Sequence, residues 1–179
     1  MTGTRQALLA AAIELLDEGG PAAVTMREVG RRAEVSHNAP YKHFADKEHL
    51  LAEIAAAELR ETASLLGEHG DDIAAAMRAV VELSLRRPQR FRLVYGPWRS
   101  APGELADAAA SAWGALIGAV ERAIRAGALP PGEPARIANL LRALAHGAVE
   151  LELGGHLTKS GDDADPAGLV DDLLSRLRG

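Results

Sequence analysis

The sequence predicts an all-α protein of about nine helices. Apolar residues recur at steps of three and four along most of the chain, which places them on one face of a helix. The composition is 47% hydrophobic but only 3% aromatic, and its many alanine and leucine residues are strong helix formers. Glycine, proline and helix-capping residues separate the periodic segments. We therefore expect helices throughout and no strands.

The first predicted helix covers residues 4–18. Leu9, Ile13 and Leu16 form its apolar stripe, and Gly19 and Gly20 are its expected end, since glycine is common just beyond a helix C-terminus. We expect this helix to be a scaffold beneath the segments that follow.

A second short helix is predicted to begin after Thr25. Thr25 and Glu28 have the spacing of a capping box. In that motif the threonine oxygen accepts the N–H of the glutamate, whose side chain returns to the threonine N–H. Glu34 and Val35 form the turn that is expected after this helix.

A third helix, at residues 37–43, has few apolar side chains to bury. Ser36 is its expected N-cap, and Pro40 lies in the first turn, where N–H groups lack helical acceptors. Its other side chains are of the kinds that reach bases and phosphates, as a recognition helix requires. Residues 25–47 hold five basic and three acidic side chains, a local charge of +2 in a chain of net charge −5. Focused DNA binding is therefore expected, not a general coating of nucleic acid.

The pattern from Thr25 to Lys47 resembles the DNA-binding motif of the TetR family of bacterial repressors. The likeness rests on the threonine-capped helix, the turn and the signature Tyr41, Lys42, His43, Phe44 and Lys47. Two positions differ from the usual family residues, because Gly30 replaces a common alanine and Glu34 a common glycine. A glycine in the middle of a helix costs about 1 kcal/mol of stability relative to alanine. A non-glycine residue at positive φ costs about the same.

The resemblance implies a dimeric, ligand-responsive transcriptional regulator, typically a repressor, that binds a palindromic operator in double-stranded DNA. It divides the chain into a helix-turn-helix domain at 1–47 and a helical regulatory domain, for ligand binding and dimerisation, at 48–179. A small hydrophobic effector is the implied ligand. The residues expected to contact DNA are Thr25, Arg27, Ser36, His37, Asn38, Ala39, Tyr41, Lys42, His43 and Lys47.

Capping residues and breakers locate the remaining helices. Asp46 is the expected N-cap of a fourth helix that reaches about Leu66, and Phe44 is expected to fill the core of the first three helices. Asp165 and Pro166 are the expected N-cap and first residue of the last helix. The helices between them are predicted at about residues 72–87, 89–95, 104–126 and 135–153.

The last two long helices carry more apolar positions than one packing face needs. Such stripes are compatible with buried core helices. They also fit a four-helix bundle formed by two copies about a two-fold axis, which the resemblance favours. The candidate dimer residues are Leu140, Leu144, Leu151, Val170, Leu173, Leu174 and Leu177.

Aromatic and methionine side chains gather in the central part of the chain. They are as compatible with core packing as with the wall of a largely apolar cavity, in which a few polar groups orient a small organic molecule. The candidate ligand residues are Met77, Phe91, Tyr95, Trp98, Trp113, Arg142 and His146.

Other classes of protein have less support. The chain has no cysteine, and the six-residue spacing of His37, His43 and His49 does not place them on one helical face, so we expect neither a metal nor a cofactor. No apolar run approaches the roughly 20 residues of a membrane span, and no signal peptide is recognisable, so we expect a cytoplasmic protein. The competing hypothesis is an α-helical small-molecule-binding or enzymatic protein with a relic helix-turn-helix, although no nucleophile–base pair supports an enzyme.

Overall fold

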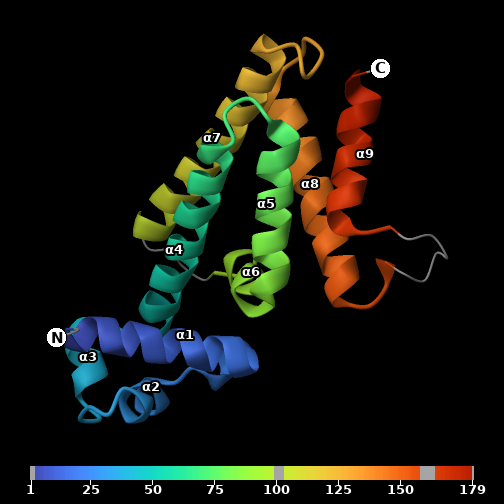
Figure 1. Ribbon diagram of the computed structural model, residues 1–179. Coiled ribbons are helices and arrows are strands. Elements are labelled where there is room, and N and C mark those ends of the chain that lie inside the picture. The colour runs from blue at the N-terminus through green and yellow to red at the C-terminus, as the bar shows by residue number, and fades with distance from the viewer. Residues whose placement is uncertain (1–2, 99–102, 158–163, 179) are drawn as a thin grey trace. The chain divides into compact units, whose positions relative to one another are not determined.

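The computed structural model describes residues 3–98, 103–157 and 164–178. Within these ranges the chain forms nine α-helices and no strand (Figure 1), which confirms the all-α prediction. The helices are α1 (Thr4–Ala23), α2 (Met26–Arg32), α3 (Ala39–His43), α4 (Lys47–Glu68), α5 (Ile73–Arg86), α6 (Pro88–Val94), α7 (Gly103–Arg125), α8 (Pro134–Leu153) and α9 (Pro166–Arg178).

The packing divides the chain into two compact units. The first unit contains Met1–Leu59 and Arg87–Ala109, and the second contains Arg60–Arg86 and Ala110–Gly179. Helix α6 joins the first unit because it packs against α1. The expected division at residue 47 concerns which residues bind DNA and which regulate, and it stays a prediction.

The core of the first unit is made by α1, α2, α4, α6, the start of α7 and Phe44. Leu8, Leu16, Val29 and Leu50 are fully buried, and Phe44 is 1% exposed. Full burial of one such side chain contributes about 1.5–3 kcal/mol. The expected role of Phe44 as the residue that fills this core is confirmed.

Helix α1 is interrupted where the sequence predicts its end. Gly19 and Gly20 leave helical geometry, and Gly20 has a φ of 68°, which glycine adopts without steric cost. A further turn, through Pro21 to Ala23, follows the break. A Cβ at Gly20 would lie 3.0 Å from Oε1 of Gln89, so this glycine also permits the close approach of α6.

In the second unit α5, α8 and α9 pack against one another (Figure 1). Asp165 begins α9 as predicted, because its Oδ1 accepts the N–H groups of Ala167 and Gly168 at 3.0 Å each. Arg78 of α5 donates to Asp171 of α9 at 2.8 Å, which ties the two helices together.

Two of the candidate dimer residues face the wrong way for that role. Val170 and Leu174 are each 1% exposed in the single chain, since this stripe of α9 packs on α5 and α8. They have almost no surface left to contribute to a dimer, so their assignment to the interface is wrong. By contrast Leu140 is 50% and Leu151 47% exposed. The remaining candidates, Leu144, Leu173 and Leu177, are half-buried.

None of the helices in the described ranges is long and apolar enough to cross a membrane.

Candidate DNA interface

The N-terminus of α2 is capped by Thr25, as predicted. Its Oγ1 accepts the Glu28 N–H at 3.2 Å. The second half of the predicted capping box is wrong, because the Glu28 carboxylate accepts from Nε of Arg31 at 3.0 and 3.1 Å. A charge-assisted bond to a guanidinium is stronger than one to a neutral backbone N–H, and this bond lowers the pKa of Glu28.

Helix α2 ends in a Schellman turn. The Glu34 N–H donates to the Arg31 carbonyl at 3.2 Å, and the Val35 N–H donates to the Gly30 carbonyl at 3.0 Å. These are the two bonds of that motif, whose residue after the cap adopts the left-handed conformation. Here that residue is Glu34, with a φ of 55°. Glu34, which stands where the family commonly has glycine, is therefore a point of backbone strain, as the sequence predicts.

Helix α3 is shorter than predicted. It covers Ala39–His43 with Asn38 as its N-cap, whereas the sequence indicated a helix from His37 capped by Ser36. The Ala39 N–H bonds the Ser36 carbonyl at 2.9 Å, so the preceding residues form a separate turn that leads into the helix. Pro40 lies in the first turn of α3, as expected.

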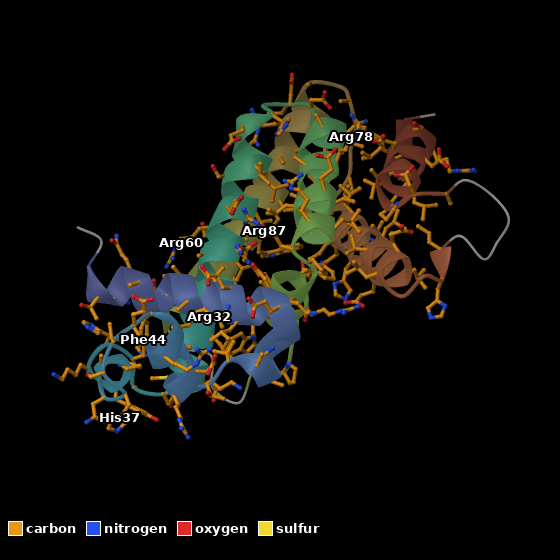
Figure 2. All side chains as sticks on the ribbon, turned by 60° about the horizontal axis from the view of Figure 1, so that its bottom comes forward. Arg32, His37, Phe44, Arg60, Arg78 and Arg87 are labelled. Atoms are coloured by element: carbon orange, nitrogen blue, oxygen red, sulfur yellow. The ribbon has the colours of Figure 1, made fainter. Side chains whose placement is uncertain are left out.

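The residues predicted to contact DNA lie at the surface of the first unit, at the start of α2, in the turn before α3, on α3 and at the start of α4. Tyr41 is 58% exposed, and Figure 2 shows His37 at the outer edge of this unit while Phe44 lies between its helices. Ala39 and Lys47 are half-buried. The exposed members of the set are Thr25, Arg27, Ser36, His37, Asn38, Tyr41, Lys42 and His43.

Two arginines of α2 are engaged within the protein. Arg31 binds Glu28, and Arg32 donates to both oxygens of Glu18 on α1 at 2.6 and 2.8 Å. The bond to Glu18 raises the pKa of Arg32, and the same bond lowers the pKa of Glu18. Glu18 lies 14 residues before Arg32 in the sequence and so outside the charge balance of residues 25–47.

Three cations remain at this surface without an ion pair among the residues that the structure describes. They are Arg27, Lys42 and Lys47. Lys47 is the first residue of α4, where the helix dipole also favours an anion. This arrangement suits contacts with phosphate groups.

A cluster of ion pairs joins α6 to α1 and α4 within the first unit. Arg90 binds Asp17 and also donates to Glu58 at 2.9 Å, and Glu58 accepts from Arg87 at 3.1 Å. The bond with Asp17 is the main reason that the pKa of Arg90 is raised. No sequence pattern indicated this cluster, because its members lie 29 to 73 residues apart.

Comparison with known proteins agrees with this architecture. Residues 8–54 match the group described as "Bacterial regulatory proteins, tetR family". Residues 73–177, more than half of the chain, match "Tetracyclin repressor-like, C-terminal domain". The chain belongs to the TetR family. This is a family of regulatory proteins and not of enzymes.

Individual proteins are similar to this chain over different lengths. The HTH-type transcriptional regulator BetI of Rhizobium meliloti (strain 1021) is 35% identical over 118 residues, which cover 66% of this chain and 52% of BetI. The chain thus spans about half the length of that relative. A solved protein of unknown function from Rhodococcus sp. RHA1 has a TM-score of 0.85 and 28% identity over 99% of this chain and 95% of that one. The regulator FadR from Bacillus subtilis, solved in complex with stearoyl-CoA, shares the fold with a TM-score of 0.68 and 16% identity over 97% of both chains.

The ligand candidates of this TetR-family chain fall in both units. In the first unit the rings of Phe91 and Tyr95 have centroids 5.2 Å apart, and Trp98 packs on the core. In the second unit the Arg142 guanidinium lies 4.8 Å from the centroid of the Trp113 ring. The other two candidates lie in the second unit, where Met77 is buried and His146 is half-buried.

Proposed function

We propose that this TetR-family chain is a transcriptional repressor that binds a palindromic DNA operator as a homodimer and releases it when a small hydrophobic effector binds. The observation that carries the proposal is the surface of residues 36–43. Its polar side chains are exposed, although the turn and short helix that bear them are followed by the buried Phe44, which anchors the segment. A rigid support with solvent-facing polar groups is what base recognition needs.

Within this surface the proposed roles divide by side-chain type. Thr25, Arg27, Tyr41, His43 and Lys47 hold phosphates, which sets affinity and register. The residues that read base edges in the major groove are those that begin the recognition segment, together with one lysine. They are His37, Asn38, Ala39 and Lys42.

Dimerisation is proposed to involve the exposed stripe of α8. Leu140, Leu144 and Leu151 follow steps of four and seven, so they share one helical face, and two of them are about half exposed. Two large apolar side chains in water on one face are typical of a surface that a partner covers. A two-fold dimer would present two recognition helices to half-sites about 34–36 Å apart.

The DNA proposal is tested by selection from random double-stranded fragments, followed by footprinting of the DNA upstream of the chain's own gene. We expect one enriched palindrome and a protected region that contains it. Failure to enrich any sequence would favour the alternative of a relic helix-turn-helix in a small-molecule-binding or enzymatic protein. In that case ligand binding would persist without specific DNA binding.

The effector proposal has a separate test, because a ligand shifts the DNA equilibrium only by its different affinity for the two states. A thermal-shift screen of small hydrophobic compounds provides candidates, and Trp98 and Trp113 provide fluorescence. We expect a hit to change this fluorescence and to release operator DNA. Trp113→Ala should weaken the ligand response more than operator binding. A saturating hit that leaves operator affinity unchanged would disprove release by that compound class.

A further inference from the structure

The contact between Gly30 and Pro40 joins the two helices of the DNA-binding motif. Gly30 is buried within α2, and a Cβ built on it would lie 3.3 Å from Cγ and 3.5 Å from Cδ of Pro40 in α3. The same Cβ would lie 3.6 Å from the carbonyl oxygen of Ser36. The absent side chain of Gly30 therefore leaves the space that the proline ring occupies.

We propose that Gly30 and Pro40 form a matched pair that sets the position of α3 on α2, and thereby determines which base edges its first residues reach. In this role Gly30 is a positioning residue for DNA specificity, although it contacts no DNA itself. The inference rests on the proposed reading of DNA by residues 37–42.

The place of the contact supports this role. Ser36 and Pro40 are the two points that a Cβ at Gly30 would approach, and they flank the exposed His37 and Asn38 and the half-buried Ala39. The 3.6 Å approach to Ser36 is ordinary van der Waals contact, whereas the 3.3 Å approach to Cγ of Pro40 is tight. Pressure on the Pro40 ring would therefore displace α3 and the base-reading residues next to it. A displacement of a few tenths of an ångström alters hydrogen-bond geometry at base edges, which depends on distances within a narrow range.

The other contacts of α3 leave little alternative room. At its C-terminal end Phe44 is 1% exposed, and its N–H donates to the Pro40 carbonyl at 2.9 Å. On the α2 side the Gly30 carbonyl is engaged by the Val35 N–H at 3.0 Å. The proline ring has few conformations of its own. Added volume at residue 30 must therefore move the helix, since the proline side chain has little freedom to rotate away.

The test compares base preference with stability in the full-length protein. Gly30→Ala, Pro40→Ala and the double variant are each passed through the same selection from random DNA as the wild type. Gly30→Ala should bind the wild-type operator about tenfold more weakly and prefer different bases in each half-site. Pro40→Ala should broaden the preference, because the ring no longer locates α3. The double variant should bind the original operator better than Gly30→Ala alone, since the added methyl group then has room.

Gly114→Ala is the matched control. Gly114 is also a helical glycine, on α7, but nothing lies within 4 Å of the position of its Cβ. This variant should leave base preference unchanged. The melting temperature of every variant is measured, because a merely structural role of Gly30 would lower stability and weaken all DNA sequences by the same factor.

Each possible result either supports or overturns the proposed role of Gly30. Unchanged relative affinities in Gly30→Ala, or a double variant no better than Gly30→Ala, would overturn the inference. If Gly30→Ala does not fold, an unchanged preference in Pro40→Ala overturns it and a broadened preference supports it. If the wild type itself selects no sequence, the proposed function is wrong and the inference falls with it.

Discussion

The Arg90 guanidinium of α6 binds the Asp17 carboxylate of α1 through two contacts of 2.9 and 2.6 Å. Because Arg90 also donates to Glu58 of α4, one side chain ties three helices of the first unit together. Its side chain is only 16% exposed, and that of Glu58 is 11% exposed. This contact fixes α6 on the unit that carries the DNA-binding motif.

Removal of this side chain should destabilise the protein. We expect Arg90→Ala to lower the free energy of unfolding by about 2 kcal/mol, because Glu58 loses an arginine partner in a mostly buried site. Urea denaturation followed by circular dichroism measures the effect. Arg78→Ala is the control, since its partner Asp171 and Arg78 itself are well exposed, and its effect should be much smaller. Equal losses of unfolding free energy in the two variants would show that the ion pairs of Arg90 stabilise the protein no more than an exposed pair does.

Relief of backbone strain at the turn should stabilise the protein. Glu34 has a φ of 55°, so we expect Glu34→Gly to raise the free energy of unfolding by about 0.5–1 kcal/mol. Glu34→Ala retains a Cβ at the same φ and should bring no such gain. Denaturant midpoints of the two variants measure the difference. A gain of equal size in both would show that the glutamate side chain, and not the backbone, is responsible.

Loss of a phosphate contact and loss of a base contact should have different signatures. Lys47→Ala should weaken all DNA sequences about equally and lower the slope of log K against log salt by about one. Asn38→Ala should change base preference at a cost of about 1–3 kcal/mol on the operator. Binding titrations at several salt concentrations measure both. Wild-type affinity of Lys47→Ala at every salt concentration would exclude its phosphate role.

Exposed and buried leucines of the C-terminal helices should respond differently to truncation. Leu151→Ala should weaken dimerisation and leave the fold of the single chain nearly unchanged, because Leu151 is 47% exposed. Leu174→Ala should destabilise the chain itself by about 2–5 kcal/mol, because Leu174 is 1% exposed. Sedimentation over a range of concentrations and urea denaturation separate the two effects. Dimers of Leu151→Ala that are as tight as wild type would remove this leucine from the interface.

The pair between Glu18 and Arg32 should depend on pH with a defined sign. The Arg32 bond lowers the folded-state pKa of Glu18 below its usual 4.5, so the pair stabilises the folded state above about that pH. As pH falls below it, the carboxylate becomes protonated and the stabilisation is lost. The gap in unfolding free energy between wild type and Glu18→Gln should therefore narrow from about pH 7 to about pH 3. A gap that is constant over this range would show that the charge of Glu18 is not responsible.

Several features of the fold were predictable from the sequence because they depend on residues close together along the chain. The Thr25 cap of α2, the break at Gly19 and Gly20, and the Asp165 cap of α9 each involve neighbours within three positions. Such signals act through backbone geometry and local hydrogen bonds, which are the same in most folded contexts. The helical period likewise showed which segments are helices, and the strained Glu34 was recognisable from its place in the motif.

The contacts between distant residues were decided only by the tertiary structure. A wide apolar stripe on α9 does not say which edge faces the chain's own core, and packing on α5 and α8 buried Val170 and Leu174. Arg32 pairs with Glu18, which is 14 residues away, and Arg90 pairs with Asp17, which is 73 residues away. The sequence does not show that the Pro40 ring packs against Gly30, because that contact depends on how α3 lies on α2. The physical reason is common to all three, since side-chain partners across helices depend on how the helices pack, and that packing is a property of the whole chain.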